Sequence, residues 1–61
     1  MRVSYMIEHG SRLMDHEEVI VNNVYLIDIH FKPDGAQELE LNTENGDPIY
    51  IDPLQLRSVT E

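Results

Sequence analysis

Residues 27–41, IDIHFKPDGAQELEL, give the strongest structural signal in the sequence, because two stretches of alternating apolar and polar residues flank a Pro-Asp-Gly triplet at 33–35. Alternation with a period of two is typical of strands with one buried face. Pro-Asp-Gly suits a type I turn followed by a left-handed residue, which makes a three-residue hairpin loop with a bulge. Such a loop sets Lys32 opposite Ala36. The stretch therefore predicts an antiparallel hairpin of defined register.

Counting outward from this turn sorts the side chains of the hairpin onto two faces, one apolar and one polar. The predicted cross-strand pairs are Ile29–Leu39 and Ile27–Leu41 on the apolar face, and His30–Glu38 and Asp28–Glu40 on the polar face. The apolar residues of both strands agree on one face, so the predicted register is consistent with a buried side.

A second turn, TENGD at residues 43–47, allows two loop lengths. A two-residue Asn-Gly loop would pair Leu41 with Tyr50 and split the apolar residues between the faces. A three-residue loop with Gly46 in a left-handed bulge pairs Leu41 with Ile49 and keeps them together, so we expect the longer loop. The shared apolar face would then contain Tyr25, Ile27, Ile29, Phe31, Leu39, Leu41, Ile49 and Ile51.

A three-stranded sheet needs a second layer to close a core. Three segments can supply it: RVSYMIE at 2–8, EVIV at 18–21 and PLQLRSV at 53–59. In the last of these, Pro53 can begin a single 3₁₀ turn before a short final strand over residues 57–60. Met6, Leu13, Met14 and Val24 are left to complete the core or to form a dimer contact.

Two polar segments separate these strands. Asn22-Asn23 is interpreted either as a type I′ turn between two strands or as a bulge that bends one long strand, and both versions fold the sheet back on itself. Residues 11–18 can hold at most one short helical turn, which Ser11 would cap. The expected fold is all-β: a strongly bent antiparallel meander of about five strands. With its turn before the last strand, this order resembles the layout of small SH3-like barrels.

Length and composition limit the classes of function. With 61 residues, the chain is expected to form a single small acidic β domain, residues 1–61. It has no cysteine, which excludes disulfides and thiolate metal sites and favours the cytoplasm. No stretch is typical of a signal peptide or a membrane span. Four basic and twelve acidic residues leave a net charge of −8, which disfavours direct binding to nucleic acid or anionic membranes and favours a basic partner.

The polar face of the predicted sheet gathers several of the acids. Asp28 opposite Glu40 is a like-charge pair that costs stability, whereas Glu38 opposite His30 should favour the imidazolium. Acids on an outer face can serve only to keep sheets from aggregating. The alternative is that they bind a basic partner, with Tyr50 as an amphipathic anchor. The predicted partner-binding residues are Asp28, His30, Glu38, Glu40, Tyr50 and Asp52.

Small, acidic, cysteine-free proteins that mimic DNA, often from phages or mobile elements, are similar to this chain in composition. The resemblance implies an inhibitor or modulator of a nucleic-acid-binding protein. The alternative is an SH3-like adaptor or structural module that binds a peptide or an assembly through an apolar groove near Tyr5, Tyr25 and Tyr50. An open edge strand could also allow a homodimer.

Neither an enzyme nor a cofactor is expected. The sequence has no thiol nucleophile, no Gly-rich phosphate loop and no G-x-S-x-G motif, and so small a chain offers little concavity for catalysis. A metal site is conceivable from Asp28, His30, Glu38 and Glu40, but ligands on a flat face seldom converge, so none is predicted. A second loose cluster, in and beside a variable loop, is expected to be ordinary loop polarity: His9, Asp15, His16 and Glu17.

Overall fold

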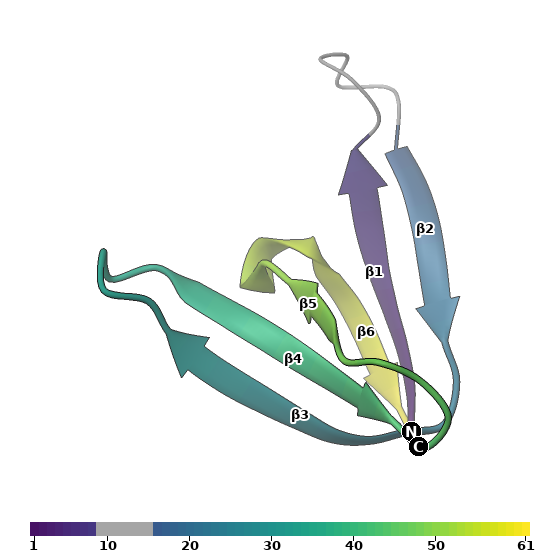
Figure 1. Cartoon of the computed structure of the whole chain (residues 1–61). Coiled ribbons are helices and arrows are strands. Elements are labelled where there is room, and N and C mark those ends of the chain that lie inside the picture. Colours follow the sequence, from purple (N-terminus) through teal and green to yellow (C-terminus); the bar gives the residue numbers. More distant parts are fainter. Residues whose placement is uncertain (9–15) are drawn as a thin grey trace.

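The computed structural model describes residues 1–8 and 16–61. In this part of the chain, six strands form two antiparallel three-stranded sheets. One sheet has the order β2-β1-β6 and the other β3-β4-β5 (Figure 1). The elements are β1 (Arg2–Glu8), β2 (His16–Val21), β3 (Val24–Phe31), β4 (Gln37–Thr43), β5 (Ile49–Ile51), the 3₁₀ turn η1 (Pro53–Gln55) and β6 (Leu56–Thr60). The predicted all-β fold is confirmed, including the 3₁₀ turn before the last strand.

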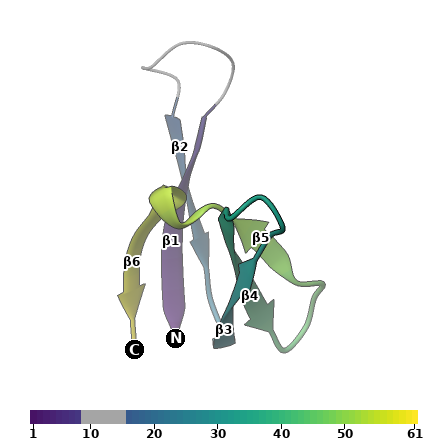
Figure 2. The same ribbon diagram turned by 90° about the vertical axis from the view of Figure 1, so that its left-hand side faces the viewer.

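The two sheets meet at one corner and diverge from it. Both chain ends lie at this corner, the β1–β2 hairpin extends from it in one direction, and the β3–β4 hairpin extends in another (Figures 1 and 2). The core lies where the sheets face each other, and the far end of each hairpin projects beyond it.

The corner is made by Asn22 and Asn23, and there one of the two interpretations is wrong. A type I′ turn needs positive φ at both central residues, but Asn23 has φ 63° and Asn22 is not left-handed. β2 and β3 also lie in different sheets. Met1 and Val24 exchange two backbone hydrogen bonds, of 2.7 and 2.9 Å, so the start of β3 continues along β1. β2 and β3 therefore follow one another as one strongly bent strand, as the second interpretation expects. They are separate elements of the two sheets, so the described residues form six strands where about five were expected.

The predicted register of the first hairpin is confirmed at every pair. Lys32 N donates to Ala36 O at 2.8 Å, Gly35 N donates to Lys32 O at 2.9 Å, and Gly35 has φ 89°. The pairs beyond the turn are Ile27–Leu41, Asp28–Glu40, Ile29–Leu39 and His30–Glu38.

The second turn has the predicted register but not the predicted geometry. Leu41 pairs with Ile49 and Leu39 with Ile51, as the three-residue loop requires. Gly46, however, does not adopt positive φ. β5 begins only at Ile49, so Asp47 and Pro48 form no ladder pair with β4. These two residues connect the turn to β5 without a left-handed bulge.

The core consists of side chains from both sheets, and Leu41, Val3 and Val24 are its largest fully buried members. Val24 completes the core as predicted, whereas placing Tyr25 on the apolar face is wrong. A bulge between Val24 and Leu26 turns Tyr25 outward, where 60% of it is exposed. The buried residues are Val3, Tyr5, Val24, Leu39, Leu41 and Ile51, together with Ser4.

Two members of the predicted apolar face remain uncovered. Ile29 is 57% exposed and Phe31 is 74% exposed, although their strand neighbour Ile27 packs against the core. They lie toward the far end of the β3–β4 hairpin, beyond the cover of the other sheet (Figure 1). Residues 9–15 lie outside the described residues. Two predictions fall there: the helical turn capped by Ser11, and the role of Leu13 and Met14 in the core or in a dimer contact.

Candidate functional site

The outer side of the β3-β4-β5 sheet carries most of the predicted partner-binding residues. We call this surface the acidic face and define it by Asp28, His30, Glu38, Glu40 and Tyr50. The confirmed register sets Asp28 directly opposite Glu40, and Glu40 directly opposite Tyr50 on the next strand. Glu40 is therefore the centre of the face.

The ion pairs of the acidic face run diagonally and not straight across. His30 Nε2 lies 3.0 Å from Glu40 Oε1, whereas Glu38, its direct neighbour, lies 3.5 Å from Lys32 Nζ. The close contact of the His30 ring is therefore with Glu40 and not with Glu38, because long side chains reach diagonal neighbours in a sheet. When the imidazole is protonated, the His30–Glu40 contact also offsets the repulsion expected between Asp28 and Glu40.

The surroundings of Glu40 favour its ionised form. The side-chain amide of Asn42, then His30 and the hydroxyl of Tyr50, lower the pKa of Glu40 below its ordinary 4.5, while desolvation opposes them. The same contact raises the pKa of Tyr50 above 10.0, because its hydroxyl donates to Glu40 and is held near that negative charge. The Glu40 side chain is only 17% exposed. It is thus an ordered carboxylate, and Tyr50 and His30 are oriented around it.

Asn42 is the neighbour that contributes most to the lowered pKa of Glu40. Its Nδ2 atom is buried and has no hydrogen-bond acceptor in ideal geometry among the described residues. A nearby amide N–H still favours a carboxylate when the two are not in ideal hydrogen-bond geometry. Asn42 is two residues from Glu40 on β4 and lies on the same face, as strand alternation predicts, but it was not among the predicted partner-binding residues.

Three side chains of the acidic face lie closer together than we expected for ligands on a flat sheet. Ligand atoms of Asp28, His30 and Glu40 all lie within 4.8 Å of one another. One imidazole and two carboxylates suit several divalent cations. To bind one, the His30–Glu40 ion pair would have to open. Glu38 is not part of this set and lies beside Lys32.

Asp52 has a different setting from the other predicted site residues. Its carboxylate accepts a 2.9 Å hydrogen bond from Leu54 N, and Gln55 Oε1 accepts one of 2.8 Å from Asp52 N. This capping box begins η1. The carboxylate of Asp52 is thus occupied in holding the turn before β6.

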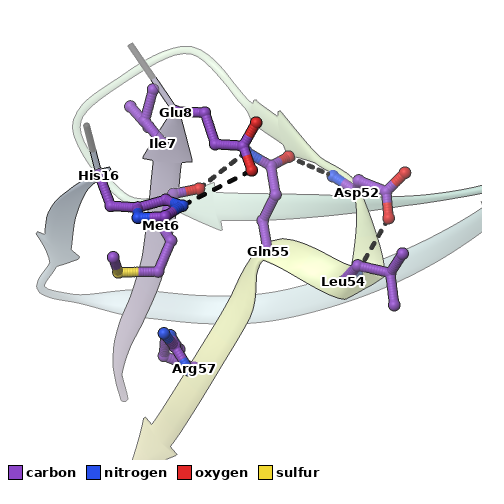
Figure 3. A pocket seen from close by; sticks show the side chains of 8 residues that line it. All are labelled: Met6, Ile7, Glu8, His16, Asp52, Leu54, Gln55 and Arg57. Atoms are coloured by element: carbon purple, nitrogen blue, oxygen red, sulfur yellow. Dashed lines mark hydrogen bonds and ion pairs between the residues drawn. The ribbon is translucent and has the colours of Figure 1, made fainter. Parts of the chain in front are cut away.

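A hollow beside η1 was not foreseen from the sequence. It has a volume of about 600 Å³ and opens between the far half of β1 and the η1–β6 segment (Figure 3). Gln55 Nε2 donates to Met6 O at 2.9 Å and fixes one wall to the other. The lining residues are Met6, Ile7, Glu8, His16, Asp52, Leu54, Gln55 and Arg57. No sequence pattern links Gln55 to Met6, so only the fold could reveal this hollow.

His16 belongs to the hollow. Its Nε2 lies 3.6 Å from Glu8 Oε1, across the β1–β2 ladder (Figure 3). The sequence had grouped His16 with His9, Asp15 and Glu17. Of these three, His9 and Asp15 lie outside the described part of the chain. The Glu8–His16 contact follows from the pairing of β1 with β2, which the sequence did not predict.

The three tyrosines of the predicted aromatic groove do not share one surface. Tyr5 is only 7% exposed and belongs to the core. Tyr25 and Tyr50 are exposed, Tyr50 on the acidic face and Tyr25 at the bulge in β3. A groove formed by all three is therefore wrong, because β1 faces the interior at Tyr5.

Comparisons with protein families, curated proteins and solved structures found no match. Within residues 1–8 and 16–61, no helix is long and apolar enough to cross a membrane.

Proposed function

We propose that this protein is a non-enzymatic cytoplasmic binding protein whose acidic face docks on the basic surface of a partner. The partner that fits this face best is a nucleic-acid-binding protein, which the docked chain would inhibit or modulate as a DNA mimic does. The observation that supports the proposal is the ordered Glu40 carboxylate, held among Asp28, His30 and Tyr50 on a rigid sheet.

Preorganised carboxylates make good partners for guanidinium groups. Glu38 is partly exposed and pairs with Lys32 at 3.5 Å, a contact that an incoming arginine could replace with a bidentate one. With a net charge of −8, the chain attracts basic surfaces from a distance before any contact forms. Tyr50 adds an exposed ring at the same face.

The test compares two charge reversals of equal size. Asp28→Lys with Glu38→Lys changes the acidic face, and Glu18→Lys with Glu44→Lys makes the same change in net charge elsewhere. The wild-type chain is immobilised, basic proteins are captured from lysate at low salt, and the strongest binder is purified and titrated with each variant. We expect duplex DNA and added salt to weaken binding to the wild type. Only the variant of the acidic face should lose binding.

Equal losses in the two variants would show nonspecific ion exchange and would contradict the proposal. Binding that does not weaken with added salt or duplex DNA would also contradict the proposal, because a nucleic-acid mimic must compete for the same cationic groups.

A second candidate function rests on the hollow beside η1. Met6, Ile7 and the almost fully exposed Leu54 give it apolar walls, which suits an adaptor that binds a peptide. In that case Leu54→Ala should weaken capture at all salt concentrations, whereas the reversals at Asp28 and Glu38 should matter little.

A further inference from the structure

β3 is an edge strand whose outer edge is almost entirely open. In the order β3-β4-β5 it has a neighbour on one side only (Figure 1). On the other side, Val24 exchanges hydrogen bonds with Met1, and no described residue pairs with the edge beyond it, from Tyr25 to Phe31. Open edges are templates for another strand.

The hydrogen bonds at the turn show which backbone groups point outward. Lys32 N donates to Ala36 O, so Lys32 and Ala36 form a hydrogen-bonded pair. In an antiparallel ladder such pairs alternate with pairs whose N–H and C=O groups point away from the partner strand. Counting back from Lys32, the backbone groups of Ile27, Ile29 and Phe31 point to the open edge.

The side chains along this edge are also suited to a contact. Ile29 is 57% and Phe31 74% exposed on one side of the sheet. On the other side lie Asp28 and His30, which have opposite charge when the imidazole is protonated. β3 contains neither Lys nor Pro, the residues that commonly block an edge.

We propose that two copies of this chain associate through their β3 strands, paired antiparallel, with Ile29 of each copy facing Ile29 of the other on a two-fold axis. This register pairs Ile27 with the partner's Phe31, and the outward-pointing backbone groups of both residues then exchange hydrogen bonds. Asp28 falls opposite the partner's His30, and His30 opposite the partner's Asp28. The contact is self-complementary, as a two-fold interface must be.

Asp28 and the partner's His30 form a non-hydrogen-bonded pair, in which the Cα atoms approach to about 4.5 Å and the side chains lie closest. Neighbouring registers are worse. An axis at Asp28 sets two aspartates against each other. An axis at His30 sets two histidines against each other and Ile27 against the partner's Pro33, which has no N–H.

The proposed dimer would extend the acidic face. Opposite residues of an antiparallel pair project from the same side of the sheet, so the acidic faces of the two copies would lie side by side on one six-stranded sheet. The proposal does not depend on what the acidic face binds, because it rests on the edge of β3.

The decisive experiment mixes two charge variants. In the Asp28→Lys homodimer, the introduced lysine lies opposite the partner's His30. In the His30→Asp homodimer, the introduced aspartate lies opposite the partner's Asp28. Both homodimers should therefore be weaker than the wild-type dimer. In the mixture, the introduced lysine of one copy meets the introduced aspartate of the other, and the remaining His30 meets the remaining Asp28. Sedimentation equilibrium should show the heterodimer forming about tenfold more tightly than either homodimer. Circular dichroism checks that each variant is folded. A change in folding alone would not make the mixture associate more tightly than its two components.

A second variant tests the edge itself. Ile29→Pro removes an N–H that points to the open edge and has no partner strand within residues 1–8 and 16–61, so the monomer should stay folded while association is lost. The dimer fraction of the wild type should rise as the protein concentration is raised from about 1 μM to about 1 mM. EDTA is present to exclude bridging of two copies by a metal ion. A wild type that stays monomeric, a mixture no tighter than its components, or an Ile29→Pro variant that still dimerises would overturn the proposal.

Discussion

The β3–β4 hairpin is covered at one end and uncovered at the other. At the corner where the sheets join, Leu41 and Val24 are fully buried. At the far end, Ile29 and Phe31 continue the same alternation and lie opposite Leu39 and Gln37 on β4, yet both are largely exposed. The difference shows that a hydrophobic pattern selects a face of a strand, whereas burial depends on whether another element reaches that face.

The largest expected effect is at the covered end. Leu41→Ala should lower the free energy of unfolding by about 3 kcal/mol, because it removes a fully buried side chain and leaves a cavity. That is comparable to the whole stability expected of so small a domain. Urea titration followed by circular dichroism measures it. A loss below about 1 kcal/mol would show that the corner is loosely packed.

The turn that sets the register should have the next largest effect. Gly35→Ala should cost about 1 kcal/mol, because φ 89° is unfavourable for a residue with a Cβ although nothing lies within 4 Å of that position. Gly46→Ala is the matched control. Gly46 is not left-handed and its added Cβ would lie 3.5 Å from Thr43 Oγ1, an ordinary contact. Equal losses from the two changes in urea titration would contradict this difference.

A smaller effect should appear only as a dependence on pH. The pKa of Glu40 is lower in the folded chain than its ordinary 4.5, so the unfolded chain binds a proton first as the pH falls. The stabilisation from Glu40 is therefore present above about pH 4.5 and is lost as the pH falls through the folded pKa. Glu40→Gln should flatten the acid limb of a plot of melting temperature against pH. An unchanged limb would exclude Glu40 as a contributor.

The smallest effect is expected at the uncovered end. Phe31→Ala should change the free energy of unfolding by less than about 0.5 kcal/mol, because the ring is already 74% exposed. The measurement requires dilute protein, where any dimer has dissociated. A loss as large as that of Leu41→Ala would show that the Phe31 ring is buried and would contradict the difference between the two ends.

Much of the acidic face could be predicted from the turns. Pro-Asp-Gly sets Asp28 opposite Glu40, and the choice that keeps Leu41 with Ile49 sets Glu40 opposite Tyr50, and both pairings are present. The ion pairs could not be predicted, because His30 selects Glu40 over Glu38 by side-chain reach and not by register.

Local features of the sequence predicted most of the strands, the register across the β3–β4 and β4–β5 turns, and the face on which most side chains of that sheet lie. Turn chemistry and a period of two are local properties of the chain, so they can be recognised without the fold. Three features are evident only in the folded chain: Asn22 and Asn23 bend the chain from one sheet into the other, Gln55 reaches Met6, and Ile29 and Phe31 lie uncovered. These features depend on how two sheets meet, and contacts between residues far apart in the chain leave no periodic signal in it.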